Sequence, residues 1–96
     1  MFENITHAEK FKNDEHDFAQ SAFRRTQAVC QSGDIGSATE LRFFLRSELD
    51  ECERRADWER SMEKYYDKNA AVSFEMEAHA FATMISRLDQ QGEGAT

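Results

Sequence analysis

The sequence contains no proline, and its four glycines fall in only two places. Gly33 and Gly36 belong to QSGDIGS, and Gly92 and Gly94 belong to the C-terminal QQGEGAT. Because proline and glycine interrupt helices more strongly than other residues, their absence from positions 37–91 favours long helices. Strand-like alternation of apolar and polar residues is also lacking, as are internal repeats and low-complexity tracts, which argues against a β-rich or repetitive fold.

Long apolar runs are missing as well. No segment approaches the roughly 18 apolar residues that a membrane-spanning helix needs. The first residues, MFENITHAEK, lack the basic region and the apolar core of a secretory signal peptide. We therefore expect a cytoplasmic protein that does not enter a membrane.

Positive charge is scarce relative to negative charge. The 96 residues include 12 Lys and Arg but 19 Asp and Glu, which gives a formal net charge of -7. Proteins that bind nucleic acids or anionic lipids use Lys and Arg to neutralise phosphate groups. The charge balance thus argues against direct binding to nucleic acid and against a membrane as partner.

The residues that are present suffice for one folded domain. Apolar residues make up 40% of the chain, and eight Phe contribute to the aromatic content. A chain of this length buries only roughly 60 to 65% of its unfolded surface, so its margin of stability is small. We expect a single helical domain over residues 1–96, to which a partner could contribute stability as well as function.

The two cysteines, Cys30 and Cys52, have neither CxxC spacing nor neighbouring histidine ligands. Both fall on expected helix faces. We interpret them as small core residues, and we do not expect a disulfide between them in a reducing compartment.

Apolar residues at intervals of three and four predict helices over residues 6–31, 37–67 and 73–90. Capping boxes, in which Ser or Thr is followed three residues later by Glu, mark the first two starts at Thr6 (THAE) and Ser37 (SATE). Ser73 is the expected cap of the third helix. The stripe of the first helix consists of Ala8, Phe11, Phe18, Ala19, Ala22, Phe23, Val29 and Cys30.

The stripe of the second helix is interrupted by Glu48, a carboxylate that we expect to be paired or to lie at the edge of the buried face. Its apolar members are Ala38, Leu41, Phe44, Leu45, Leu49, Cys52 and Ala56, with Met62 and Tyr66 as a continuation. The third helix has a narrow seam of Phe74, Ala78, Phe81, Ile85 and Leu88, with Met84 beside it.

The predicted fold class is all-α: a small antiparallel bundle of three long helices. A break of the second helix near Ala56–Trp58 would give four helices. Residues 91–96 are expected to form a flexible tail.

No residue constellation typical of catalysis occurs. GDIGS contains two glycines three residues apart, but it lacks the Gly-Lys-Ser/Thr sequence of a phosphate-binding loop and no predicted strand precedes it. None of the serines has the surroundings of an activated nucleophile. We therefore predict a protein that is not an enzyme and that has no cofactor and no catalytic or cofactor-binding residues.

The histidines lie among acidic residues, which leaves a metal-binding helical bundle as one alternative. Glu75 and His79 are four residues apart, whereas carboxylate-bridged di-iron bundles use Glu-x-x-His from two helices. The other two histidines, His7 and His16, supply no second copy of that motif. We assign no metal ligand.

Acidic residues of the second helix raise another alternative, an inhibitor that mimics nucleic acid. Five arginines are interleaved with these carboxylates, however. Asp50 with Arg54, and Glu51 with Arg55, have the favourable order for pairs four residues apart. This pattern favours a solvated helix face with ion pairs over one continuous acidic surface.

Aromatic residues away from the buried stripe indicate either a binding surface or positions that a third helix or a second copy of the chain covers. At about 100° per residue, Phe43 points about 160° away from Leu41, and Trp58 and Tyr65 lie at the edge of the stripe. Exposed aromatic residues next to Arg are typical of binding hot spots. The predicted protein-interface residues are Phe43, Arg54, Arg55, Trp58, Tyr65, Arg24 and Arg25.

The segment KFKNDEHDFAQSAFRR resembles the N-terminal part of the alphaproteobacterial zeta inhibitory subunits of F1-ATPase. That resemblance implies a four-helix protein whose N-terminal helix enters a rotor interface. The apolar Trp-containing segment that the family has after the Arg pair is replaced here by TQAVCQ. The matching residues are Lys10, Phe11, Asp14, Glu15, Arg24 and Arg25.

The main functional hypothesis is a small acidic module that acts by binding another protein or a protein complex. It could be an inhibitor, an adaptor or a small regulatory subunit, including one encoded by a phage or mobile element. A second copy of the chain is a further option as partner. The alternatives are a nucleic-acid-mimicking inhibitor, a zeta-like inhibitory subunit and a metal-binding bundle.

Overall fold

A computed structural model describes residues 2, 4–7, 15–62 and 68–94 of the chain. These residues form three helices and no strand: α1 (Glu15–Ser32), α2 (Ala38–Ser61) and α3 (Lys68–Gly94). The all-α prediction is therefore confirmed. Within the described residues, none of the helices combines the length and the apolar character that crossing a membrane requires.

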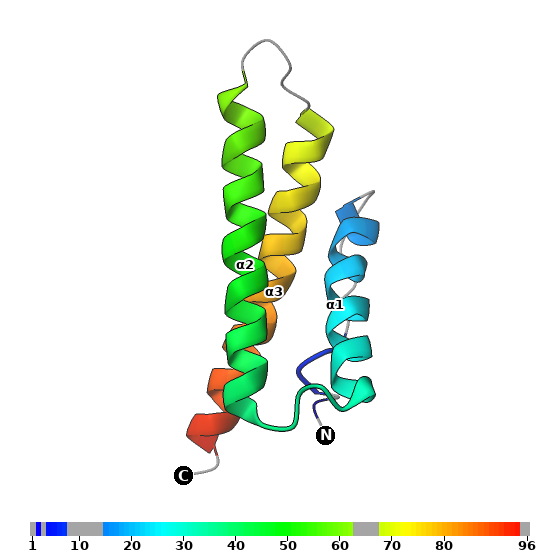
Figure 1. The fold of residues 1–96 in the computed structure, drawn as a ribbon, viewed down its shortest axis with the longest axis vertical. Helices are drawn as coiled ribbons and strands as arrows, with labels where there is room; N and C mark the ends of the chain where they lie inside the picture. Colours follow the sequence, from blue (N-terminus) through cyan, green and yellow to red (C-terminus); the bar gives the residue numbers. More distant parts are fainter. Residues whose placement is uncertain (1, 3, 8–14, 63–67, 95–96) are drawn as a thin grey trace.

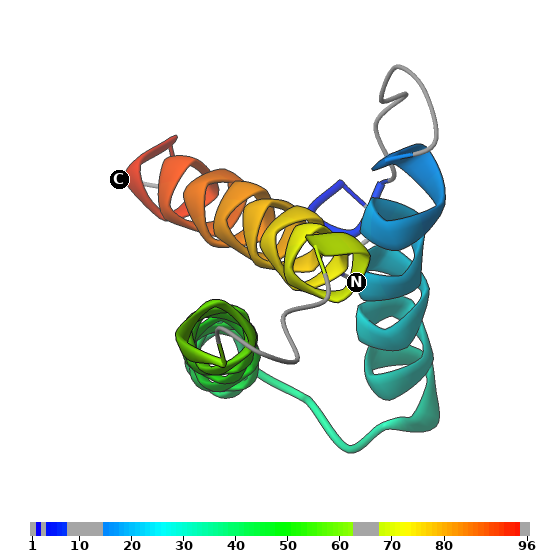
Figure 2. The same cartoon turned by 90° about the horizontal axis from the view of Figure 1, so that it is seen from above.

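The three helices run antiparallel in chain order (Figure 1). Helices α2 and α3 form a long hairpin, and α1 lies along α3 near the end where the α1–α2 loop is found (Figure 1). Seen from above, α3 packs against both other helices, whereas α1 and α2 have little direct contact (Figure 2). The molecule is elongated, with extents of 50 × 26 × 25 Å, because α1 accompanies only part of the hairpin.

Helix α2 begins as its sequence predicts. Ser37 has an extended backbone and its hydroxyl oxygen accepts a hydrogen bond from the Glu40 backbone N–H at 3.2 Å. The helix then continues without a break through Ala56–Trp58, so the described residues contain three helices rather than four. Met62 ends the helix, and residues 63–67, into which the prediction extended, lie outside the described residues.

The first helix does not begin at Thr6, and this prediction is corrected. Residues 4–7 form a turn in which the Thr6 N–H and hydroxyl both donate to the Phe2 carbonyl at 3.1 Å. The turn directs Ile5 into the core, where it is fully buried. Burial of this apolar side chain outweighs the local capping signal at Thr6.

The third helix is longer than predicted at both ends. It begins at Lys68, so Ser73 lies inside it, and the Ser73 hydroxyl donates to the Ala70 carbonyl at 2.9 Å rather than capping a terminus. The alanines at positions 70 and 71 favour a helical start of this segment. At the other end the helix extends to Gly94 and includes much of the predicted tail.

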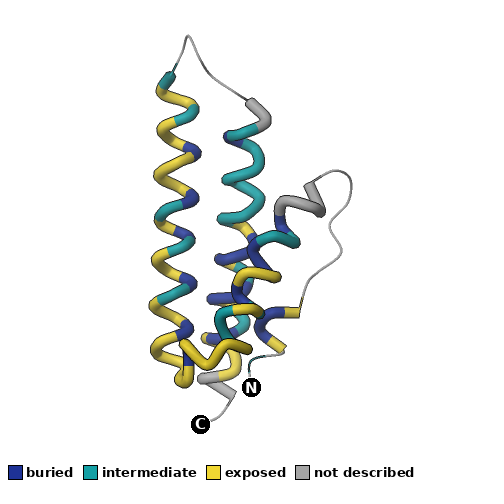
Figure 3. Tube along the Cα trace, turned by 45° about the vertical axis from the view of Figure 1, so that its right-hand side comes forward, coloured by how far each residue is buried: buried dark blue, intermediate teal, exposed yellow. Residues whose placement is uncertain are grey.

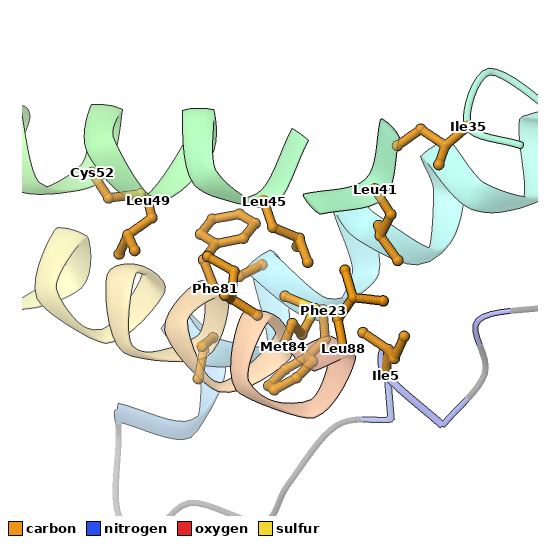
Figure 4. Close-up of a cluster of buried hydrophobic side chains, with 14 residues drawn as sticks. Ile5, Phe23, Ile35, Leu41, Leu45, Leu49, Cys52, Phe81, Met84 and Leu88 are labelled. Carbon is orange, nitrogen blue, oxygen red and sulfur yellow. The ribbon is translucent and has the colours of Figure 1, made fainter. Parts of the chain in front are cut away.

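The core lies where the three helices and the N-terminal turn meet (Figure 4). Thr26 of α1 is buried among apolar residues, and its hydroxyl is satisfied by donating to the Ala22 carbonyl at 2.9 Å. The stripes of the three helices largely match the predicted ones. The buried apolar members are Ala19, Ala22 and Phe23 of α1, Leu41, Leu45, Leu49, Cys52 and Ala56 of α2, and Ala71, Ala80, Phe81, Met84, Ile85 and Leu88 of α3.

The part of the hairpin away from the α1–α2 loop is less completely covered. Residues 72–78 of α3 are all of intermediate burial, and the outward side of α2 is mostly exposed (Figure 3). Helix α2 therefore presents one long side to solvent, and this side carries the candidate site.

Candidate protein-binding surface

Two large apolar side chains of the described residues remain exposed, and both belong to α2. Phe43 is 76% exposed and Trp58 is 58% exposed. At about 100° and 1.5 Å per residue, the two side chains point within about 60° of each other and lie about 22 Å apart along the helix. The buried stripe of α2 is complete without them, so their exposure is not a defect of core packing.

Trp58 shares its stretch of the chain with a thioether and with guanidinium groups. Met62, one turn further along the chain, is of intermediate burial. The Arg55 guanidinium lies over the Phe74 ring of α3, 5.8 Å from its centroid. Arg54 is exposed on the outward side of the helix. The structure thus places Trp58, Arg54 and Arg55 on one stretch of α2.

Both arginines of this stretch share one carboxylate. Glu51 accepts from Arg54 Nη2 at 2.6 Å and from Arg55 Nε at 2.8 Å. These hydrogen bonds, from Arg54 first and Arg55 second, lower the pKa of Glu51. Arg54 and Arg55 are exposed and Glu51 is of intermediate burial, so solvent screens these pairs and they contribute little to stability.

The ion pairs of α2 agree with the predicted pattern in one case and differ in another. The pair of Glu51 with Arg55 is confirmed. Asp50 pairs instead with Arg46 at 3.8 Å, because Arg54 turns toward Glu51 and binds both of its oxygens. Such i,i+3 and i,i+4 choices are close in energy.

Arg25, unlike Arg54 and Arg55, forms ion pairs between helices. Its Nη2 lies 3.3 Å from a Glu48 oxygen and 3.9 Å from a Glu77 oxygen, and its guanidinium is 5.3 Å from the Phe81 ring centroid. It therefore connects α1 to both other helices. The expectation that Glu48 is paired is confirmed by the same contact.

Two predicted interface residues remain, Arg24 and Tyr65. Arg24 is exposed on α1, a different helix from Phe43 and Trp58. Tyr65 lies outside the described residues.

A groove next to Phe43 was not found from the sequence. We call it the Phe43 groove; it has a volume of about 590 Å³ and lies where the end of α1, the α1–α2 loop and the start of α2 meet. Val29 and Ile35 join the aromatic pair only through the tertiary fold. The sequence feature that could have indicated an apolar surface here is the doublet FF at positions 43 and 44, because adjacent helical residues cannot both face one core. The main lining residues of the Phe43 groove are Val29, Asp34, Ile35, Glu40, Phe43 and Phe44.

One thiol lies close to the charged groups Arg25, Glu48 and Glu77. Cys52 is buried and its thiol donates to a Glu77 oxygen at 3.7 Å. Burial, the negative charge of Glu77 and this hydrogen bond raise the pKa of Cys52 to about 12. The thiol is thus held in its protonated, unreactive form at neutral pH.

The described residues contain no group of three or more His, Cys, Asp or Glu side chains arranged to hold a metal ion. His79 is exposed on α3, and His7 is exposed beside the N-terminal turn. His16 belongs to the side chains that the structure does not describe.

Comparison of the chain with protein-family models, with curated proteins and with solved structures gave no match.

Proposed function

We propose that this chain is a non-enzymatic helical module that binds another protein through the outward side of α2. One observation carries the proposal: Phe43 and Trp58 are exposed on the same side of one continuous helix, although the core beneath that helix is complete. Single exposed apolar residues are common on protein surfaces. Two large aromatic residues aligned on one helix, one of them flanked by arginines, are characteristic of a binding surface.

The energetics support such a surface. Covering a large apolar side chain contributes roughly 2 kcal/mol. Arg54 and Arg55 add planar donors that can bind carboxylates of a partner. A continuous helix holds these groups in place, so binding does not have to order a flexible loop.

Nucleic-acid mimicry receives less support from the surface. Arginine side chains interrupt the carboxylates along α2: Arg46 pairs with Asp50, and Arg54 pairs with Glu51. A mimic of a phosphate backbone needs carboxylates that are free to bind the basic residues of its target. The surface near Trp58 is mixed in charge and aromatic, which suits a protein partner.

Site-specific photo-crosslinking in the native cells tests the proposal. A photoreactive benzoylphenylalanine would replace Trp58 in one variant and Phe43 in another. The matched control carries the same group at Glu53, an exposed position of α2 that points about 80° away from Phe43 and about 140° away from Trp58.

The expected result is a single adduct of defined mass, formed from positions 58 and 43 and not from position 53. Adducts of equal yield from all three positions would mean random encounters, and their absence from positions 43 and 58 would refute binding through this side of α2.

A further inference from the structure

The Phe43 groove has an apolar floor that comes from three different parts of the fold. Val29 belongs to α1, Ile35 to the α1–α2 loop, and Phe43 and Phe44 to α2. Ile35 is buried and Phe44 is of intermediate burial, so both are fixed by the core. Phe43 stands free at 76% exposure and forms one wall of the groove. Its volume of about 590 Å³ is within the range of sites that accept several apolar groups.

The rim of this groove carries negative charge only. Asp34 and Glu40 are its charged lining residues, and no Lys or Arg lines it among the described residues. Each carboxylate accepts a hydrogen bond from a neighbouring serine, Asp34 from Ser32 at 3.0 Å and Glu40 from Ser37 at 3.2 Å. Neither takes part in an ion pair among the described residues.

The arginines of the same stretch of α2 do not neutralise the rim. Arg42 pairs with Asp89 of α3, and Arg46 pairs with Asp50. The positive end of the α2 dipole, which would otherwise attract an anion, is already matched by Glu40 in the first turn. The groove is therefore apolar at its floor and electronegative at its rim.

We propose that the Phe43 groove binds a basic amphipathic helix of a partner protein, an inference that rests on the proposed binding function. Apolar residues of that helix, spaced three and four apart, would occupy the floor beside Phe43 and Phe44. Lys or Arg residues at its flanks would reach Asp34 and Glu40. This assignment names the chemistry of the partner: cationic and amphipathic.

Charge favours a cationic helix over a second copy of the chain as the occupant of the groove. Each copy has a net charge of -7, so self-association through this groove would bring acidic surfaces together. A cationic helix gains electrostatic attraction at the same place, and its association rate should fall with added salt.

Titration with synthetic peptides tests the inference on the full-length chain. The probe is a fluorescein-labelled amphipathic helix of about 14 residues made of Leu and Lys, and the comparison peptide carries Glu in place of every Lys. Fluorescence anisotropy should show saturable binding of one Leu/Lys peptide per chain, and no saturable binding of the Leu/Glu peptide.

Three variants locate the binding. Phe43→Ala should weaken binding about tenfold, because it removes a wall of the groove. Asp34→Asn with Glu40→Gln should weaken it several-fold and reduce its salt dependence. The matched control, Glu53→Gln with Asp57→Asn, removes the same number of carboxylates from exposed positions of α2 outside the groove and should change binding less than about twofold.

The single Trp reports where the peptide binds. Trp58 lies about 22 Å from Phe43 along α2, so its emission should not change when a Trp-free peptide occupies the groove. A blue shift of that emission would overturn the inference. An equal loss of peptide affinity in the Asp34→Asn/Glu40→Gln variant and in the Glu53→Gln/Asp57→Asn control would overturn it as well.

Two further outcomes would overturn it: binding of the Leu/Glu peptide in place of the Leu/Lys peptide, and dimerisation in light scattering that Phe43→Ala abolishes. Failure of peptide binding together with successful crosslinking from position 58 would reject this groove and leave the proposed function standing. Absence of crosslinking from both positions would reject the function itself.

Discussion

Arg25 of α1 and Glu48 of α2 form an ion pair, with Nη2 of the guanidinium 3.3 Å from Oε2 of the carboxylate. The pair joins two helices that have little direct contact with each other. It is supported by Glu77 of α3, 3.9 Å from the same guanidinium nitrogen, and by the Phe81 ring beneath. Arg25 thus links α1 to both helices of the α2–α3 hairpin.

The pair should contribute modestly to stability. Both side chains are partly exposed, at 46% for Arg25 and 30% for Glu48, so solvent screens their attraction. Urea unfolding followed by circular dichroism should give a coupling energy of about 0.5 to 1 kcal/mol in the cycle of Arg25→Ala and Glu48→Ala. Arg25→Ala alone should cost about 1 to 2 kcal/mol because it also loses the Phe81 contact. The neighbouring Arg24→Ala should change the free energy of unfolding by less than about 0.5 kcal/mol. If Arg24→Ala destabilised the chain as much as Arg25→Ala, the bridging role of Arg25 would be contradicted.

The two cysteines should differ in reactivity. Cys52 is buried with its pKa raised to about 12, whereas Cys30 is only half-buried and its pKa is raised by burial from 9.0. In the folded chain at mildly alkaline pH, iodoacetamide should modify Cys30 first, and urea should be needed before Cys52 reacts at a comparable rate. Mass spectrometry of the peptides containing each residue measures both rates. Faster alkylation of Cys52 would show that its thiol is not enclosed by α2 and α3.

The raised pKa of Cys52 also sets the direction of a pH effect. Above pH 9 the unfolded chain loses the thiol proton while the folded chain retains it up to about pH 12. The folded state then binds more protons, so the free energy of unfolding should fall as pH rises through this range. Cys52→Ala should flatten the dependence, which urea titrations at several alkaline pH values would measure. An unchanged slope in that variant would assign the effect to other groups.

Ser37 should contribute measurably as the cap of α2. Its hydroxyl accepts from the Glu40 N–H at 3.2 Å. Ser37→Ala should lower the free energy of unfolding by about 1 kcal/mol, and Ser37→Gly by only a few tenths, because glycine leaves the helix end open to water. Ser47→Ala, an exposed position inside the helix, is the control and should not destabilise the chain. Equal effects of Ser37→Ala and Ser47→Ala would rule out the cap.

Trp58 should be dispensable for folding. Because it is 58% exposed, its fluorescence should be quenched readily by acrylamide, and Trp58→Ala should change the free energy of unfolding by less than about 1 kcal/mol. The double change Trp58→Ala with Tyr65→Ala should weaken partner binding more than folding, as measured by crosslinking yield from position 43 against urea unfolding. Cooperative loss of structure in the double variant would instead mark these residues as part of the core.

Much of the architecture could be read from local patterns. The buried residues Leu41, Leu45 and Leu49 recur at intervals of four, and this periodicity sufficed to predict which face of α2 is buried. The cap at Ser37 was equally local, since its partner Glu40 lies three residues away. The prediction of a helix start at Thr6 failed because a long-range contact outweighed a local sequence pattern. The capping pattern favours a helix there, whereas the fold forms a turn that buries Ile5 in the core.

Some features of the candidate site could likewise be read from the sequence, and others depend on the tertiary fold. The angles of Phe43 and Trp58 on a single helix could be read from the sequence alone, but their exposure depends on the tertiary structure, because another helix could have covered them. The bridging position of Arg25 and the meeting of Val29, Ile35 and Phe43 in one groove depend on how the helices pack. Periodicity specifies which face of a helix is apolar, but the partner of each face is set by contacts between residues far apart in the sequence, and only the tertiary structure decided those.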